Sequence, residues 1–518
     1  MEALAPETDQ PWSRLDKRML LVHPVTEVVK FIPVLIGSVI LGTSSGNHVW
    51  SFIPLALIVG FALTRWFTTT YRVGPTHVEL RTGLLQRKKL AVPRSRIRSV
   101  DIEADLLHRI LGLAVLAIGT GQQADKGDKF KLDALDARLV PELRTALLAH
   151  TGGAPHSVAG QSLPSADPTV AEPSDGQSGR EIAHWNPSWV RYAPLSLTGF
   201  AFIAPIVGVA FQYGVGQVLF RSDAVHRVQT GGAALIAIGT VVLIAVIVLV
   251  VSLAACARYL TTYFGLRVLD DGRTLHLRHG LFTTRQITLD LARFRGATVN
   301  EPLLLRLAGA AELEAIMVGA SPRQKILPQA PRTAVEHTLS HLLAPNEFQD
   351  KVIAAPTEGP TPGSAPLIAH GPIARRRRYI RTLAPIAVAA LVMAAFSVAG
   401  ADFSPWWLAL PALLVPVAIA LAEDRYRGLG HAVLPGTATR PTWLITRSGS
   451  LGRDRDCLEA PGVIGWTVRQ SFFQRRAGVA TVVAASAAGK KRYHVLDIPL
   501  DEAFAFIDAV TPGQLGTR

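Results

Sequence analysis

Apolar residues in this chain gather into six stretches that occur in three pairs. A membrane-spanning helix needs about 20 mostly apolar residues, and residues 232–257 meet this requirement without a single charge. Residues 28–43 form the weakest stretch, because they are few and include Lys30 and Pro33. The other stretches are 50–67, 195–213, 385–398 and 406–422. The pattern predicts six transmembrane helices arranged as three hairpins.

A polar segment with strand-like alternation follows each pair. Residues 77–92 and 274–289 alternate apolar with polar side chains around a central glycine, which is typical of antiparallel β-hairpins. Each segment then closes with a stretch of helical character, at residues 141–150, 331–343 and 500–510. The repeating unit is therefore a helical hairpin, several strands and one helix.

Three windows of the sequence align without gaps and indicate that these units are copies of one another. Residues 97–112, 294–309 and 463–478 each end in a glycine, and each has an arginine three places before it. Similarity that recurs in a fixed order indicates a repeated structural unit. We assign a structural role in the repeat register to these positions, which are Arg109, Gly112, Arg306, Gly309, Arg475 and Gly478.

The predicted fold class is an α+β membrane protein with six transmembrane helices in three hairpins. Each hairpin precedes an antiparallel β-sandwich or barrel that is closed by a C-terminal helix. Segments rich in Gly, Pro, Ser and Ala separate the copies and are typical of flexible linkers. The predicted divisions are an N-terminal segment 1–26, hairpins 27–67, 191–258 and 379–422, strand-rich domains 68–150, 259–345 and 423–512, a flexible linker 151–190 and a basic linker 346–378.

The formal charge of +14 occurs together with a mean hydropathy of +0.28, which indicates that basic and apolar stretches are segregated along the chain. Basic residues flank the predicted helices on the side of the termini and the strand-rich domains. The connections within the first and third hairpins contain no Lys or Arg, although the middle connection contains Arg221 and Arg227. Because positive residues favour the cytoplasmic side, we expect a multi-pass cell-membrane protein whose termini and domains are cytoplasmic.

Two basic clusters are candidate contacts for lipid headgroups. The first lies in residues 81–98, which contain no acidic residue, and Arg94, Arg96 and Arg98 would share one face of a strand. Basic residues near an anionic leaflet contribute about 1 kcal/mol each to membrane binding. For the first cluster the alternative is a solvated strand face. For the second, a topological anchor for the third hairpin is the preferred interpretation, and lipid contact is the alternative. The candidate residues are Arg87, Lys88, Lys89, Arg94, Arg96, Arg98, Arg375, Arg376, Arg377 and Arg378.

No catalytic, metal or cofactor motif is present in the sequence. His337 and His341 have helical spacing but lack a third zinc ligand, so a solvated helix face explains them better. Cys256 and Cys457 are too far apart in sequence to suggest a disulfide framework. We therefore expect no enzyme activity and no cofactor. Nucleic acid is not an expected partner either, because the basic residues follow the membrane edges.

Residues 92–121 resemble the bacterial PH domain-containing membrane proteins of the YdbT type. These residues carry a proline, then Ile-x-x-Val, then a Leu-rich stretch ending in Leu-Gly-Leu-Ala. The second copy keeps Leu-x-Arg-Leu-Ala-Gly, and the third keeps Pro461 but is otherwise divergent. The resemblance implies a PH-like fold of two roughly orthogonal antiparallel sheets closed by a helix. It also implies a smaller single-domain relative as a partner and a link to resistance against antimicrobial compounds.

The sequence favours a membrane-anchored binding or scaffold protein. Its PH-like domains would contact proteins or anionic lipids at the inner leaflet, with a role in envelope stress or antimicrobial resistance. The alternative is a component of a transporter or exporter built from the six helices. Ionisable residues inside the spans would support that alternative, and Lys30 is the only clear one.

Overall fold

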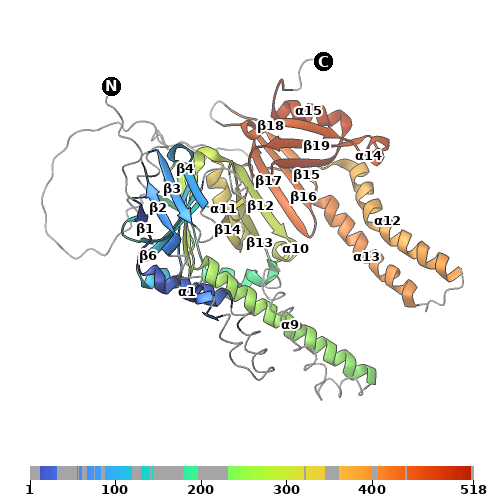
Figure 1. The fold of residues 1–518 in the computed structure, drawn as a ribbon. Coiled ribbons are helices and arrows are strands. Elements are labelled where there is room, and N and C mark those ends of the chain that lie inside the picture. Colours follow the sequence, from blue (N-terminus) through green and yellow to red (C-terminus); the bar gives the residue numbers. More distant parts are fainter. Residues whose placement is uncertain are drawn as a thin grey trace. The chain divides into compact units, whose positions relative to one another are not determined.

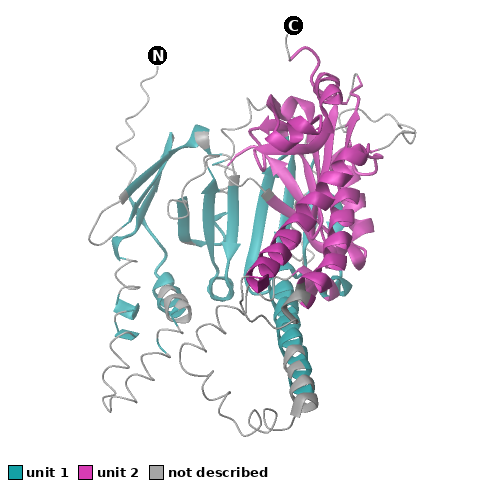
Figure 2. Ribbon diagram, turned by 90° about the vertical axis from the view of Figure 1, so that its right-hand side faces the viewer, with its two compact units in different colours: residues 1–190, 197–291 teal, residues 191–196, 292–518 magenta. Residues whose placement is uncertain are grey.

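Two compact units make up the described part of the protein, residues 1–190 with 197–291 and residues 191–196 with 292–518 (Figure 2). Every described strand pairing within them is antiparallel. The computed structural model describes residues 12–31, 35, 55–56, 58–60, 67–74, 76–82, 88–97, 99–119, 130–140, 143, 147, 179–196, 232–319, 323–344, 361–398, 406–437 and 440–514.

The first unit contains a four-stranded and a seven-stranded sheet (Figure 1). The smaller sheet has the order β1-β2-β3-β4, with bounds Ser13–Arg14, Thr70–Val73, His77–Thr82 and Lys88–Pro93. The larger sheet has the order β7-β6-β5-β11-β10-β9-β8, with bounds Phe130–Asp136, Leu113–Gly119, Ser99–Ala104, Thr284–Asp290, Thr274–His279, Arg267–Asp270 and Arg180–His184.

The second unit contains a six-stranded and a three-stranded sheet. The larger sheet has the order β14-β13-β12-β17-β16-β15, with bounds Arg323–Pro331, Ala310–Met317, Phe294–Pro302, Gly452–Glu459, Trp443–Gly449 and Gly430–Leu434. The smaller sheet has the order β18-β19-β20, with bounds Val463–Arg469, Val479–Ser486 and Arg492–Pro499.

Each copy of the repeat contributes strands to two different sheets. The first copy supplies β1–β4 and β5–β7, the second β8–β11 and β12–β14, and the third β15–β17 and β18–β20. The two larger sheets each join the second sheet of one copy to the first sheet of the next, through β5 with β11 and through β12 with β17. The copies are therefore not separate domains on flexible tethers, since neighbours share hydrogen-bonded sheets.

A one-turn helix between two strands recurs at the aligned windows. It is α4 (Leu106–Ile110), α10 (Leu303–Leu307) and α14 (Phe472–Arg476) in the three copies. The aligned glycine follows each helix with a φ of 68°, 70° and 66° at Gly112, Gly309 and Gly478. Only glycine adopts this left-handed conformation at little cost. The gap-free alignment thus corresponds to one backbone geometry in all three copies.

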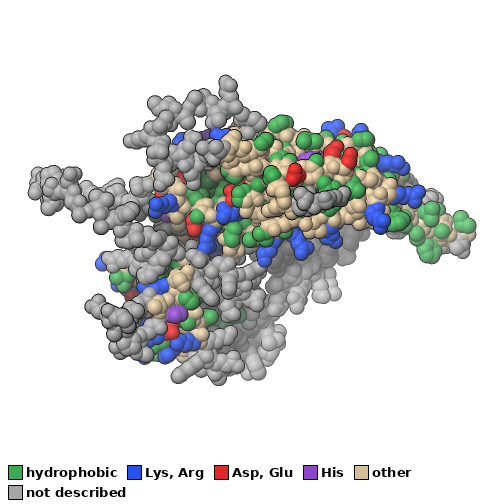
Figure 3. Space-filling view, turned by 90° about the horizontal axis from the view of Figure 1, so that it is seen from above, with side chains coloured by type: hydrophobic (Ala, Val, Ile, Leu, Met, Phe, Trp, Pro, Cys, Tyr) green, Lys and Arg blue, Asp and Glu red, His purple; other side chains and the backbone are tan. Residues whose placement is uncertain are grey.

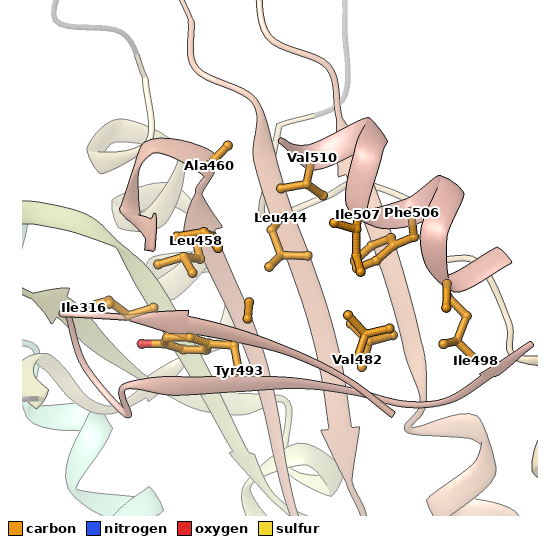
Figure 4. Packing of buried hydrophobic residues seen from close by; sticks show 14 of the residues in the cluster. Ile316, Leu444, Leu458, Ala460, Val482, Tyr493, Ile498, Phe506, Ile507 and Val510 are labelled. Carbon is orange, nitrogen blue, oxygen red and sulfur yellow. The ribbon is translucent and has the colours of Figure 1, made fainter. Parts of the chain in front are cut away.

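Apolar residues from two sheets and a closing helix form the core of the third copy. Leu444 and Leu458 come from the six-stranded sheet, and Val482 comes from the three-stranded sheet. Figure 4 shows Phe506 and Ile507 of α15 (Leu500–Val510) facing this cluster. The second copy ends in α11 (Arg332–Leu342), which packs on β13 and β14. The first copy has a comparable core, and most of residues 141–150, where its closing helix was predicted, lie outside the described residues.

Two described helices are long and apolar enough to cross a membrane: Ala245–Tyr263, within α9 (Gly232–Tyr263), and α12 (Gly371–Val398). Their apolar side chains are exposed, for example Leu253 at 62% and Leu391 at 71%. Helix α12 pairs with α13 (Trp406–Arg427) where the third hairpin was predicted (Figure 1). The predicted stretches 28–43, 50–67 and 195–213 fall mainly outside the described residues.

Ordered elements occupy parts of the segments predicted to be linkers or tails. Strand β1 pairs with β2, and helix α1 (Met19–Lys30) buries Met19 and Val22 against Leu113. Strand β8 pairs with β9 at the end of the predicted flexible linker. The 3-10 helix η3 (Pro187–Ser196) follows β8. The sequence predicted no structure for these segments, because their local composition favours none. They form strands and helices through contacts with residues far away in the chain.

Candidate functional site

The basic residues of the first copy are partly neutralised by an acid on the adjacent strand. Lys89 on β4 has a half-exposed side chain, and its Nζ lies 2.7 Å from Oε1 of Glu79 on β3. Arg72 on β2 binds the other carboxylate oxygen at 2.6 Å. The hydrogen bond from Lys89, together with that from Arg72, holds the pKa of Glu79 below its usual value against the effect of burial. Glu79 therefore organises this surface, and the sequence analysis did not identify it.

The predicted alternation of Arg94, Arg96 and Arg98 along one strand is interrupted in the structure. Strand β4 ends at Pro93, and Arg94–Arg96 form the 3-10 turn η2. Arg94 is half-buried, and its Nη1 donates to the carbonyl of Gly74 at 3.4 Å. Arg87, Arg98 and the side chains of Lys88 and Arg96 lie outside the described residues. Among the described residues, a single cationic strand face is therefore not formed.

The second basic cluster is divided by the helical period of α12. Arg375 and Arg376 are exposed, and the Arg375 Nε donates to Glu423 of α13 at 3.0 Å. Arg377 and Arg378 are each only 8% exposed. This differs from the prediction that all four residues meet lipid headgroups, because consecutive helical positions point to different sides. Of the four, only Arg375 and Arg376 are exposed.

A buried carboxylate binds the inward half of that cluster. The Arg377 Nε donates to Oδ1 of Asp497 at 3.0 Å, and Arg378 Nη2 lies 3.0 Å from Oδ2. Gln474 of α14 also donates to Oδ1, at 2.8 Å. Asp497 is 1% exposed and has a φ of 55° on β20. This Asp497 node ties the start of a candidate membrane helix to the strand-rich part of the third copy.

The repeat-register arginines make the same contact in the first two copies. Arg109 Nη1 donates to the carbonyl of Leu281 at 3.1 Å, and Arg306 Nη1 approaches the carbonyl of Ser450 at 3.5 Å. Each acceptor directly follows a glycine with a positive φ, which is Gly280 just after β10 and Gly449 at the end of β16. The arginine of one copy thus contacts the hairpin turn of the next copy. Arg306 also binds Asp424 at 2.7 Å, and the hydrogen bonds from Arg306 and Ser450 outweigh burial and lower the pKa of Asp424.

Strand pairing completes these junctions between copies. At the first junction Arg285 lies opposite Glu103, with Nε 3.8 Å from Oε1. At the second, Asp454 lies opposite Asn300. Thr298 there donates to Asp456 at 2.6 Å. Opposite charges or hydrogen-bonding groups therefore face one another where the copies meet, as expected for stabilising cross-strand pairs.

Two histidines form a buried pair in the third copy. His431 Nδ1 lies 2.9 Å from His370 Nε2, and His370 Nδ1 lies 2.6 Å from the carbonyl of Leu496. Burial and the neighbouring His370 lower the pKa of His431 to about 4. Burial also lowers the pKa of His370. Both rings are therefore neutral at pH 7, and the pair forms a polar contact inside the strand-rich part of the third copy, which we call the third module.

The described residues form no metal centre, and the face seen in Figure 3 carries no single basic patch. In the view of Figure 3, the Lys and Arg side chains are spread among hydrophobic and other groups. Among the described residues, no group of three His, Cys, Asp or Glu side chains could hold a metal ion. His337 is exposed on α11, and His341 is half-buried one turn later.

The Asp497 node and the histidine pair were not found by sequence reasoning. Their partners are 120 and 61 residues apart in the chain, so no local spacing could reveal them. The repeat-register arginines were found by alignment, but their acceptors are backbone carbonyls that any residue could supply. Alignment identifies a recurring position, whereas only the tertiary structure shows what it contacts.

Comparison with known proteins gives one match. The model of a family described as "Bacterial PH domain" (bPH_2) matches residues 24–151 and 217–343, which correspond to the first and second copies. No curated protein and no solved structure matches the chain. The third copy lies outside the matched residues, yet it has the same order of strands, one-turn helix and closing helix.

Proposed function

Because the chain belongs to the bacterial PH domain family over residues 24–151 and 217–343, we propose that it is a non-catalytic membrane scaffold. Its PH-like modules would bind proteins or anionic lipid at the inner leaflet. The observation that carries this proposal is the Asp497 node, which joins α12 to the third module through Arg377 and Arg378. A module held in this way stays at the bilayer surface.

The basic residues that remain exposed beside the membrane helix are the ones available to contact lipid. Arg376 is exposed at the start of α12 and has no hydrogen-bond or ion-pair partner among the described residues. Arg375 is exposed as well, although Glu423 already binds it. An exposed arginine near an anionic leaflet contributes about 1 kcal/mol to binding. The excess of positive residues on this side also supports a cytoplasmic orientation.

Hydrogen exchange of the full chain in lipid nanodiscs tests this proposal. We expect the amides of the first two turns of α12 to exchange more slowly when the bilayer contains phosphatidylglycerol than when it is entirely phosphatidylcholine. Arg376→Gln should remove most of this difference. Arg492→Gln, at an exposed position on β20, serves as the matched control and should leave it intact. Equal exchange of the wild-type chain in both bilayers would contradict anionic-lipid contact at this site.

A further inference from the structure

The two junctions between copies have the same register. The cross-strand pairs Glu103–Arg285 and Asn300–Asp454 join residues at equivalent positions. Glu103 and Asn300 each lie nine residues before the aligned glycines, Gly112 and Gly309. Arg285 and Asp454 each lie six residues before the 3-10 turns η4 (Leu291–Arg293) and η6 (Ala460–Gly462). The repeat thus has a defined tail edge, at β5 and β12, and a defined head edge, at β11 and β17.

The one-turn helix beside each tail edge receives the turn of the incoming hairpin. Arg109 and Arg306 contact the turn carbonyls of Leu281 and Ser450. At the second junction the backbone N–H of Leu303 also donates to the carbonyl of Leu451 at 2.8 Å. A tail edge is therefore recognised by strand pairing together with an arginine that holds the turn.

The third copy has a tail edge that no other described strand covers. Strand β18 is the equivalent of β5 and β12, and β19 is its only neighbour among the described strands. Arg475 is the equivalent of Arg109 and Arg306, is exposed, and has no side-chain partner in the described part of the chain. Phe472 and Phe473 beside it are 72% and 71% exposed, whereas Leu304 at the occupied second junction is 44% exposed.

The first copy has the complementary head edge. Strand β4 is the equivalent of β11 and β17, because each is the last strand of a first sheet and each precedes a 3-10 turn. Its only neighbour among the described strands is β3. We propose that β18 of one chain pairs antiparallel with β4 of a second copy of this chain, in the register of the internal junctions. This goes beyond the proposed function and does not depend on lipid contact.

The charges on β18 and β4 weaken the proposed contact between two chains but do not prevent it. The shared register places Arg469, nine residues before Gly478, opposite Lys88, six residues before η2. Like charges directly opposite each other on neighbouring strands are destabilising. Covering the exposed phenylalanines is favourable, because it removes apolar surface from water. We expect an association that is weaker than the internal junctions, because those junctions join opposite charges or hydrogen-bonding groups. A head-to-tail contact of this kind builds rings or filaments.

Cross-linking between two differently tagged full-length chains tests the register in membranes. One chain carries Arg469→Cys and the other Lys88→Cys, so that only an intermolecular contact yields a mixed-tag product. The control replaces Arg469→Cys with Arg492→Cys, which lies on β20 at the opposite edge of the same sheet. We expect a mixed-tag product for the first pair at a yield at least about tenfold above the control, a factor that corresponds to about 1.4 kcal/mol.

Charge variants test the proposal independently of folding defects, because one of them is expected to increase association, which misfolding would not do. Lys88→Glu would restore the acid–base pairing seen at the first junction, so association measured by energy transfer between labelled chains should rise by up to about tenfold. Arg475→Ala should lower it by roughly tenfold. Arg476→Ala, which removes the adjacent exposed arginine, should leave it unchanged. Equal cross-linking for both cysteine pairs, unchanged association in Lys88→Glu, or cross-linking of the tail only to a different polypeptide would overturn the proposal.

Discussion

Asp497 shows how much of the third module depends on one carboxylate. It is almost fully buried and meets the side chains of Arg377, Arg378 and Gln474. A buried ion pair contributes little by itself, because burial costs each ion its hydration. Removing one partner is different, since it leaves the remaining charges buried and uncompensated. The node therefore matters most through the cost of breaking it.

Asp497→Asn is expected to destabilise the third module by about 3–5 kcal/mol, the usual cost of leaving a buried charge unpaired. Asparagine tolerates the left-handed backbone that Asp497 adopts, so the change removes charge without adding backbone strain. The thiol of Cys457 provides the measurement. It is fully buried in this module, and burial raises its pKa to about 12, so it reacts only when the module opens.

Labelling of Cys457 in the full chain should accelerate in Asp497→Asn. Asp501→Asn, which removes an exposed carboxylate from the first turn of α15, should have little effect. Indistinguishable labelling rates in the two variants would mean that the node does not stabilise the module.

The pair His370–His431 makes the third module sensitive to acid. An unperturbed histidine has a pKa of about 6.5, whereas burial and His370 lower the pKa of His431 to about 4 in the folded state. Between these values the unfolded chain binds more protons than the folded chain. The contribution of His431 to the free energy of unfolding is therefore fully present above about pH 6.5. It is lost as the pH falls toward 4, by up to about 1.4 kcal/mol per pH unit.

Thermal unfolding of the full chain at pH 7.5 and pH 5 should show this loss for the wild type. His431→Gln removes the titrating group and should reduce the difference in Tm between the two pH values, even if it lowers both. A pH dependence as large in His431→Gln as in the wild type would show that other groups are responsible.

At the scale of secondary structure, the most consequential pairing is β12 with β17. This pairing joins the second sheet of the second copy to the first sheet of the third, and it runs from Gly296–Leu458 to Pro302–Gly452. Gly296 has a φ of 146°, and a Cβ atom built on it would lie 1.9 Å from the carbonyl oxygen of Cys457. The close approach of the two strands therefore requires glycine at this position.

Gly296→Ala is expected to destabilise this junction by at least about 1–3 kcal/mol, because β17 would have to shift away. The matched control is Gly452→Ala at the other end of the same pairing, where a Cβ atom would meet nothing within 4 Å. Protease susceptibility of the two variants at a series of denaturant concentrations measures the difference. Similar susceptibility of both variants would show that the approach at Gly296 can relax at little cost.

At the scale of the whole molecule, the copies are linked through shared sheets as well as through the chain. Each internal junction uses an edge strand of one copy to cover an edge strand of the next, which removes two exposed edges that would otherwise favour aggregation. Among the described strands, one tail edge, at β18, and one head edge, at β4, have no second neighbour. A second chain offers the complementary edge to each of them.

Local pattern alone determined the repeat and its order. The gap-free windows located the one-turn helices and the glycines with positive φ, because such a glycine is required wherever the chain turns in this way. Apolar length located the two described helices that are long and apolar enough to cross a membrane, which lie in α9 and α12. These features depend on neighbours within a few residues, and a sequence displays them directly.

Tertiary structure decided what those elements contact. Strand alternation predicted the hairpins but not that β5 would pair with β11, nearly two hundred residues away. The run at Arg375–Arg378 looked uniform in sequence, yet two of its members are buried against Asp497 and two are exposed. Which strands pair and which charges are buried depends on the surfaces that meet in the folded chain. These contacts join residues that are far apart in sequence, so a local pattern does not predict them.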